Sequence, residues 1–259
     1  MEAIQTVATD KKITPAEATQ VFLQVLVLKH LSLPGTHFMG GTALVMGYGN
    51  PRFSEDIDLT QVKNPLHLSQ GLKNAAREAS QWLRTPVHVK EPKPKSRSWK
   101  LLCTLNPAQT IRLHIDTQPF KAYTTRPIVI EFPSLTSFVC EALTLEEILS
   151  EKMLALAFRN YLGGRDLFDL WFHWLRKSDW HSQEKEIRHL VKLKLTERKL
   201  RLVQFQQNLK NRLVPHPVLS RARLEWKRYL PPNFQNENIF KDIIKCHQKL
   251  KGWLENGAS

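Results

Sequence analysis

Residues 52–59 read RFSEDIDL, and the upstream residues 38–44 read FMGGTAL. Alternate residues of a strand point to the same side of a sheet, so Asp56 and Asp58 share one face while Ile57 faces the core. A glycine pair that follows a short apolar run is typical of a strand turning into a helix. The two segments predict such a turn, followed by a strand that presents two carboxylates.

Two carboxylates held side by side are unfavourable unless a cation neutralises them. Mg²⁺ fits this pair, since it takes a few carboxylates together with phosphate oxygens and water. Two such ions about 4 Å apart can activate an attacking hydroxyl and stabilise a departing pyrophosphate. Gly40 and Gly41 let backbone N–H groups approach a phosphate closely, at the positive end of the helix that follows. We therefore expect a phosphate-binding site with two Mg²⁺ ions, and Mn²⁺ as the alternative.

A third carboxylate is expected at Asp116. The segment 110–117 alternates apolar and polar residues, which predicts a strand with its apolar side chains on one face. The other face carries Arg112, His114 and Asp116. Asp116 is the candidate third metal ligand, and the alternative is an acid that faces water at the end of the strand. His114 is expected to be a bystander, with substrate orientation as the alternative.

Further helices and strands surround these segments. Thr14 and Thr144 each precede a glutamate by three residues, the pattern of a capping box that opens a helix. Helices are expected over 14–31, 42–48, 65–83, 144–159 and 165–176. Strands are expected over 37–39, 55–60, 87–90, 99–105, 110–117 and 127–132. We predict an α+β fold, with a mixed α/β domain over 1–140 and a basic helical domain over 141–259.

The chain of 259 residues carries a net charge of +14, which is expected to attract polyanions. RNA or DNA is the first expected partner, and an anionic membrane surface or an acidic protein is the alternative. Between Lys185 and Arg228, thirteen Lys or Arg residues face three acidic ones, a local net charge of +10. This segment is expected to bind a polynucleotide, and the alternative is a solvated face.

The cysteine and hydropathy patterns indicate a protein of a reducing cytoplasm. The three cysteines show no CxxC spacing, which argues against a disulfide framework or a zinc site. The apolar stretch 21–28 is interrupted by Gln24 and is too short to span a bilayer. No signal-peptide pattern is found. We expect residues 21–28 to form a core-facing helix and the protein to have no membrane partner.

The motifs resemble the DNA polymerase β-like nucleotidyltransferase superfamily, and within it the AbiEii/AbiGii toxin group, which includes the MenT-type toxins. The resemblance rests on Gly-Gly, then Arg-x-Ser-x-Asp-Ile-Asp-Leu, then a distant carboxylate on a strand. Residues 151–156, EKMLAL, resemble the family's helix with a phosphate-binding lysine. Residues 165–170, RDLFDL, resemble its Arg-Asp-x-x-Asp-Leu motif. The match covers 38–171, and Gly-Gly-Thr stands where the superfamily has Gly-Ser.

The resemblance implies a role for each matching residue. Metal binding would fall to Asp56, Asp58 and Asp116, and triphosphate contact to Gly40, Gly41, Thr42 and Lys152. Arg52 and Ser54 would shape the loop beside the metal, and Asp166 would support or complete the site. Pairing with neighbouring helices is the alternative for Arg165 and Asp166, and Asp169 is expected to be structural. Trp171, Trp174 and Trp180 are expected to pack helices rather than stack on bases.

The resemblance further implies a toxin that transfers a nucleoside monophosphate from a nucleoside triphosphate (NTP) to RNA. The tRNA 3′ end is the expected acceptor, and a cognate antitoxin the expected protein partner. The N-terminal domain would then be a polymerase β-like mixed sheet with flanking helices, and the helical bundle after it would complete the active site and bind RNA. One alternative is transfer to a protein or a small molecule. Another is a non-enzymatic module that binds nucleotide or nucleic acid, which the intact acids disfavour.

Overall fold

The computed structural model describes residues 2–31, 35–60, 65–93, 96–161, 163–212 and 217–255. The chain divides into two compact units. The first comprises Met1–Gly47 and Ser54–Leu143, and the second comprises Tyr48–Phe53 and Thr144–Ser259. The boundary expected near residue 140 falls inside a strand, and a short segment of the N-terminal half belongs to the second unit.

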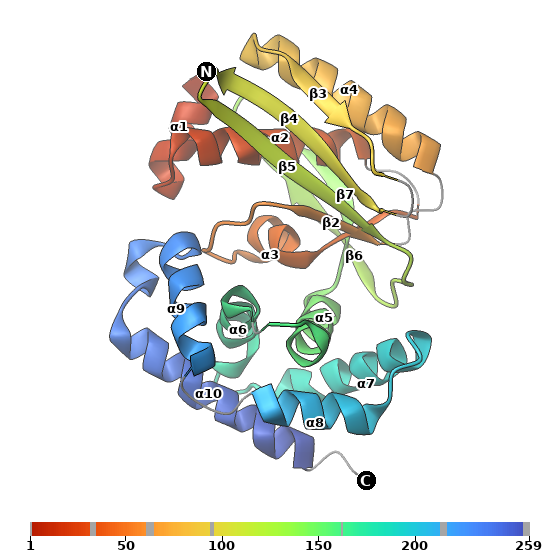
Figure 1. Cartoon of the computed structure of the whole chain (residues 1–259), viewed down its shortest axis with the longest axis vertical. Coiled ribbons are helices and arrows are strands. Elements are labelled where there is room, and N and C mark those ends of the chain that lie inside the picture. Colours follow the sequence, from red (N-terminus) through yellow and green to blue (C-terminus); the bar gives the residue numbers. More distant parts are fainter. Residues whose placement is uncertain are drawn as a thin grey trace. The chain divides into compact units, whose positions relative to one another are not determined.

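The first unit is built on a mixed seven-stranded sheet of order β3-β4-β5-β2-β1-β7-β6 (Figure 1). Its strands are β1 (His37–Met39), β2 (Ile57–Thr60), β3 (Val87–Lys90), β4 (Ser98–Asn106), β5 (Gln109–Gln118), β6 (Thr125–Ile130) and β7 (Phe138–Leu143). β2 lies inside the sheet, antiparallel to β1 and parallel to β5. Backbone hydrogen bonds join β2 to both β1 and β5, so the positions of the side chains at the start of β2 are fixed.

The helices of the first unit are α1 (Glu2–Lys11), α2 (Pro15–Leu31), α3 (Gly40–Tyr48, whose last residue belongs to the second unit) and α4 (Pro65–Leu83). The capping box of α2 is confirmed, because Thr14 N–H donates to Glu17 Oε2 at 2.8 Å and Glu17 N–H donates to Thr14 Oγ1 at 3.2 Å. α4 packs against α2 and β3 (Figure 1). Residues 21–28 of α2 face the core as expected, with Leu23 and Leu26 fully buried.

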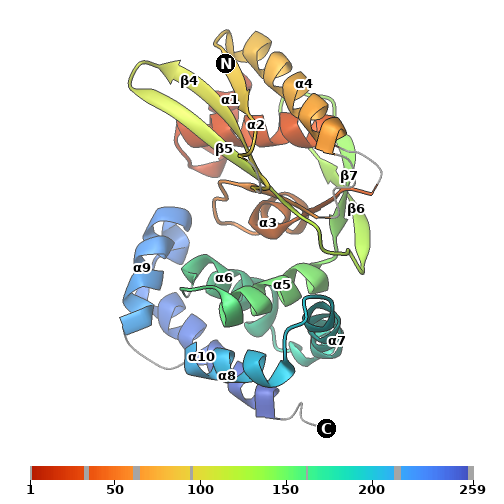
Figure 2. The same ribbon diagram turned by 45° about the vertical axis from the view of Figure 1, so that its right-hand side comes forward.

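The second unit is helical, which together with the sheet confirms the predicted α+β class (Figure 2). Its elements are α5 (Leu145–Phe158), α6 (Gly164–Leu170), the π-helical turn η1 (Trp171–Leu175), α7 (His181–Glu197), α8 (Leu202–Arg212), α9 (Pro217–Tyr229), the 3₁₀ turn η2 (Pro232–Phe234) and α10 (Glu237–Glu255). α5 packs against α6, α7 and α8. The helix expected over 165–176 is thus α6 followed by a π-turn.

Aromatic and ionic contacts hold this unit together. Trp171 and Trp174 are 4% and 0% exposed, and Trp180 packs on Trp174 at 5.8 Å between ring centroids, which confirms that they pack helices. The basic segment 185–228 is not uniformly a surface. Lys194 is buried, and its ammonium pairs with Glu147 at 2.7 Å in the interior.

Two further features bear on expectations from the sequence. Cys103, Cys140 and Cys246 are buried free thiols. Within the described part of the chain, no helix has both the length and the apolar character needed to cross a lipid bilayer.

Candidate functional site

Gly40 lies directly beneath the carboxylate of Asp58. β1 ends at Met39 and α3 begins at Gly40, whose φ of +78° is rarely adopted by residues with a side chain. A Cβ atom at Gly40 would lie 2.0 Å from Asp58 Oδ2. The glycine is therefore required twice, once by the turn and once by the close approach of the acid.

Asp58 and Asp116 are neighbours on parallel strands. They are register partners between β2 and β5, one position after the pair Ile57 and Ile115. Both isoleucines are 0% exposed, and both aspartates are half-buried. The acids therefore lie on the face opposite the isoleucines, and the sheet brings together two residues that are far apart in sequence.

Asp56 comes directly before β2, two residues from Asp58. Among the residues that the structure describes, no group of three or more His, Cys, Asp or Glu side chains is arranged to hold a metal ion by itself. Mg²⁺ seldom needs such a cage, because it usually binds one or two carboxylates together with substrate phosphates and water. The paired carboxylates of Asp58 and Asp116 therefore fit a Mg²⁺ ion shared with a triphosphate.

Thr42 ties the glycine turn to the acid loop. Its hydroxyl lies 2.8 Å from the Ser54 hydroxyl and also hydrogen bonds the Asp56 carbonyl oxygen. A carbonyl only accepts and a hydroxyl has one proton, so Thr42 donates to Asp56 and Ser54 donates to Thr42. Thr42 is 1% exposed. The Thr42 hydroxyl is thus engaged within the protein, whereas backbone N–H groups at the start of α3 have no partner within the helix.

Two glutamines of α2 hold the same loop from the other side. Gln24 Nε2 donates to the Ser54 carbonyl at 2.9 Å, and Gln20 Nε2 donates to the Glu55 carbonyl at 2.8 Å. The pair lies one helical turn apart, so both reach one stretch of backbone. Sequence reasoning did not assign these residues to the site. Gln24 could have been noticed in the sequence, because it is a polar residue inside an apolar run. Its side chain is 1% exposed in the structure.

The second unit contains a buried ionic cluster centred on Asp169. Arg52 binds Asp169 in a bidentate pair, with Nε 2.6 Å from Oδ1 and Nη2 2.9 Å from Oδ2. Asn50 Nδ2 also donates to Oδ1 at 2.9 Å. Lys152 Nζ lies 2.7 Å from Asp166 Oδ1 and 3.0 Å from Asp169 Oδ2. The lysine predicted to contact phosphate and the second acid of the Arg-Asp-x-x-Asp motif therefore meet.

The cluster favours the charged forms of Lys152 and Asp169. Burial alone would lower the pKa of Lys152, but Asp166 and Asp169 outweigh it and raise that pKa above its usual value. Burial alone would raise the pKa of Asp169, but Arg52 and Lys152 lower it well below its usual range. Asp169 is 0% exposed, in keeping with the structural role expected for it.

Asp166 is placed by a second cation and a glycine. Arg159 Nη1 donates to Asp166 Oδ2 at 2.6 Å, and the Arg159 side chain is 49% exposed. A Cβ atom at Gly163 would lie 2.8 Å from the same oxygen. The Arg165 side chain packs on an aromatic ring, with its guanidinium carbon 4.5 Å from the centre of the Tyr229 ring.

Comparisons with known proteins identify the family of this chain. Residues 26–246 match the sequence profile of a family described as nucleotidyl transferase AbiEii toxin, type IV toxin–antitoxin system. The chain belongs to this family. It is accordingly a nucleotidyltransferase toxin of a toxin–antitoxin system, with a nucleotide substrate and an antitoxin partner. No protein among the curated ones matches the sequence.

The fold of this AbiEii-family chain is also found in a solved structure with a TM-score above 0.5. The nucleotidyltransferase toxin MenT4 of Mycobacterium tuberculosis H37Rv aligns over 98% of this chain and 89% of its own, with 15% identity and a TM-score of 0.56. A putative nucleotidyltransferase from H. pylori aligns over 92% of this chain and 95% of its own, with 18% identity and a TM-score of 0.49.

The predicted residues thus fall into two groups. The first unit holds Gly40, Gly41, Thr42, Ser54, Asp56, Asp58 and Asp116. The second unit holds Arg52, Lys152 and Asp166. Arg52 was expected to shape the loop beside the metal. Its guanidinium donates to the Phe53 carbonyl of that loop and also pairs with Asp169, which the sequence placed outside the site.

Proposed function

We propose that this toxin transfers a nucleoside monophosphate from an NTP to an RNA acceptor, with the tRNA 3′ end as the expected site. The observation that carries the proposal is that Asp58 approaches Gly40 closely and is the register partner of Asp116 in the middle of the sheet. A glycine turn at a helix N-terminus suits a triphosphate, and the carboxylates beside it suit the Mg²⁺ that accompanies a triphosphate.

The acids of β2 and β5 have a shared proposed role in metal binding. Asp58 and Asp116, with Asp56, would hold one or two Mg²⁺ ions, with Mn²⁺ as a substitute. When bound, such ions neutralise phosphate charge and favour departure of pyrophosphate. Backbone N–H groups of Gly41 and Thr42 would hold a phosphate, while Thr42, Gln24 and Gln20 keep the acid loop in place.

The proposed reaction is an in-line displacement. A ribose 3′-hydroxyl forms a bond to the α-phosphorus, the bond from that phosphorus to the bridging oxygen breaks, and pyrophosphate leaves. The hydroxyl proton passes to the carboxylate of Asp116. The family resemblance assigns Lys152 to a phosphate contact, and Asp166 would position its ammonium.

The basic character of the chain supports RNA as the acceptor. Its net charge is +14, and the segment from Lys185 to Arg228 presents exposed cations among its described residues. Lys185, Lys192 and Lys210 are exposed. Polyanion binding through such groups weakens steeply as salt rises, because bound phosphates release counterions.

The test is to incubate the protein with total tRNA, a protein extract, Mg²⁺ and each α-labelled NTP in turn. An Asp56→Ala/Asp58→Ala variant serves as the control. We expect label to enter RNA only with the intact protein, which would also name the preferred nucleotide. Label that enters protein instead would contradict RNA as the acceptor while keeping the enzyme class. Tight RNA binding with no transfer of any nucleotide would contradict the proposal as a whole.

A further inference from the structure

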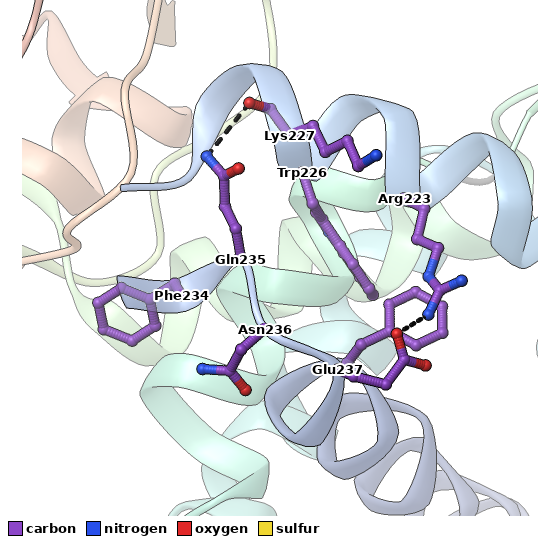
Figure 3. Close-up of a pocket in the computed structure, with 8 residues that line it drawn as sticks. Arg223, Trp226, Lys227, Phe234, Gln235, Asn236 and Glu237 are labelled. Carbon is purple, nitrogen blue, oxygen red and sulfur yellow. Dashed lines mark hydrogen bonds and ion pairs between the residues drawn. The ribbon is translucent and has the colours of Figure 1, made fainter. Parts of the chain in front are cut away.

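The second unit contains a small pocket between α9, η2 and α10 (Figure 3). Its volume is ≈ 200 Å³. It is lined by three aromatic residues, Trp226, Phe234 and Phe240, and by the polar residues Arg223, Lys227, Gln235, Asn236 and Glu237. We refer to it as the α9–α10 pocket. Pockets for drug-sized molecules have about 300–1,000 Å³, so this one suits a single flat ring rather than a whole NTP.

The aromatic walls of the α9–α10 pocket are held rigidly. Trp226 meets Phe240 edge to face, with ring centroids 4.8 Å apart at 71°. Its indole N–H donates to the Gly164 carbonyl at the start of α6. Phe234 packs edge-on against Phe168 of α6 at 5.6 Å. Walls that are ordered before binding lose little entropy when a ligand enters, which favours stacking of a flat ring.

One polar side chain gives the pocket a directional contact. Gln235 Nε2 donates to the backbone carbonyls of Lys227 at 3.2 Å and Leu230 at 2.5 Å. Both amide protons are thereby used, so the group that Gln235 can offer a ligand is its acceptor oxygen. Figure 3 shows this oxygen on the side of the amide group nearer to Trp226. An acceptor there suits the exocyclic amino group of adenine, cytosine or guanine.

Cations stand at the same pocket. The guanidinium of Arg223 lies 4.1 Å from the centre of the Phe240 ring and pairs with Glu237. Lys227 is exposed one helical turn further along α9. Proteins hold single-stranded nucleic acid with aromatic rings and nearby exposed cations, because bases stack on the rings and the cations neutralise the phosphates.

We propose that the α9–α10 pocket binds one unpaired base of the RNA acceptor, with flanking phosphates on Arg223 and Lys227. The inference rests on the proposed function in taking RNA as the acceptor, and it deepens that function by placing a contact. Two walls of the pocket are packed on α6, the helix that carries Asp166 and Asp169. A bound base would therefore contact side chains that pack on the helix carrying the two acids of the buried ionic cluster.

The test measures the affinity of full-length protein for labelled tRNA without NTP, so it is independent of catalysis. Phe240→Leu keeps apolar bulk but removes the aromatic wall that packs against Trp226 and Arg223, and we expect it to weaken binding by about tenfold. Phe240→Tyr should retain the wild-type affinity. Lys227→Gln should weaken binding more than Lys210→Gln, which removes the same charge from an exposed position on α8.

A crosslinking experiment keeps the proposal testable if the leucine variant folds poorly. Wild-type protein irradiated with 4-thiouridine-labelled tRNA should yield a crosslinked peptide within 223–240. Unchanged affinity of Phe240→Leu, or crosslinks confined to other segments, would overturn the pocket while leaving RNA transfer intact. Pocket variants that weaken antitoxin binding but not RNA binding would also overturn it. Failure of the proposed function would look different, since the wild-type protein would then label no RNA, whether or not it binds RNA.

Discussion

Arg52 lies four residues before Asp56 in the chain, yet its guanidinium is bound by Asp169, 117 positions away, at 2.6 Å and 2.9 Å. The Arg-x-Ser-x-Asp motif is thus divided. Arg52 is fixed in the helical unit, whereas Ser54 and Asp56 are fixed in the sheet unit. This motif is continuous in the sequence, but the chain passes from the helical unit to the sheet unit within it.

The Asp169 carboxylate should contribute strongly to stability. Asp169→Asn would leave Arg52 and Lys152 buried with one negative partner fewer, and breaking a buried pair costs about 3–5 kcal/mol. Urea unfolding measures the change in the free energy of unfolding. Asp179→Asn is the control, because Asp179 is an exposed acid of the same unit and should change stability by less than ~0.5 kcal/mol. A loss below about 1 kcal/mol for Asp169→Asn would contradict the buried-cluster account.

Gly40→Ala should abolish activity for a geometric reason. Its Cβ would collide with Asp58 and displace the carboxylate, and a misplacement of about 1 Å can lower a rate about 100-fold. Gly49→Ala is a matched control, because Gly49 has a φ of +68° but open space around its Cβ. Both variants should lose about 1–2 kcal/mol of stability from the backbone strain. Equal transfer rates for the two variants would refute the contact between Gly40 and Asp58 as the reason for the glycine.

Thr42→Val separates positioning from phosphate binding. If the hydroxyl holds the acid loop, as its bond to the Asp56 carbonyl indicates, kcat should fall about tenfold or more and the KM for NTP should change little. Gln24→Leu should give the same pattern, because it releases the adjacent Ser54 carbonyl. A raised KM with an unchanged kcat would instead place the Thr42 hydroxyl on the triphosphate.

Stability should fall at mildly acidic pH because of two buried histidines. Burial lowers the pKa of His173 and of His247 to about 4, from an ordinary value of 6.5. The unfolded chain therefore binds more protons than the folded one below pH 6.5, and stability is lost as the pH falls from 6.5 towards 4. Between pH 7.5 and 5.0 each histidine should account for roughly 2 kcal/mol. Urea unfolding of His247→Leu at both pH values should show a smaller loss than wild type, and an identical loss would exclude this residue.

Local periodicity predicted much of the site. The alternation around Ile57 and along 110–117 placed the aspartates on one face, because side chains in a strand repeat every two residues. It could not show that Asp58 and Asp116 are register partners, since that depends on β2 pairing with β5. The polar residue Gln24 was visible in its apolar run, but its partner, the Ser54 carbonyl, is set by packing.

The misses share a physical cause. The pairing of Arg52 with Asp169 is a long-range contact that no local pattern contains. β7 escaped prediction because its short alternation runs almost directly into the cap of α5 at Thr144. The helix expected over 165–176 changes to a π-turn at Trp171, where packing of large aromatic rings prevails over helix propensity.

The most direct test of the central claim is the single-turnover rate of nucleotide transfer by Asp58→Asn. The substitution keeps the size of the side chain and removes its charge. We predict a fall of about a thousandfold, the order expected when several kcal/mol of transition-state stabilisation is lost. Circular dichroism should stay unchanged, and the Asp179→Asn control should transfer at the wild-type rate. A folded Asp58→Asn protein that transfers nucleotide within about tenfold of wild type would contradict the assignment of the active site to the acids of β2.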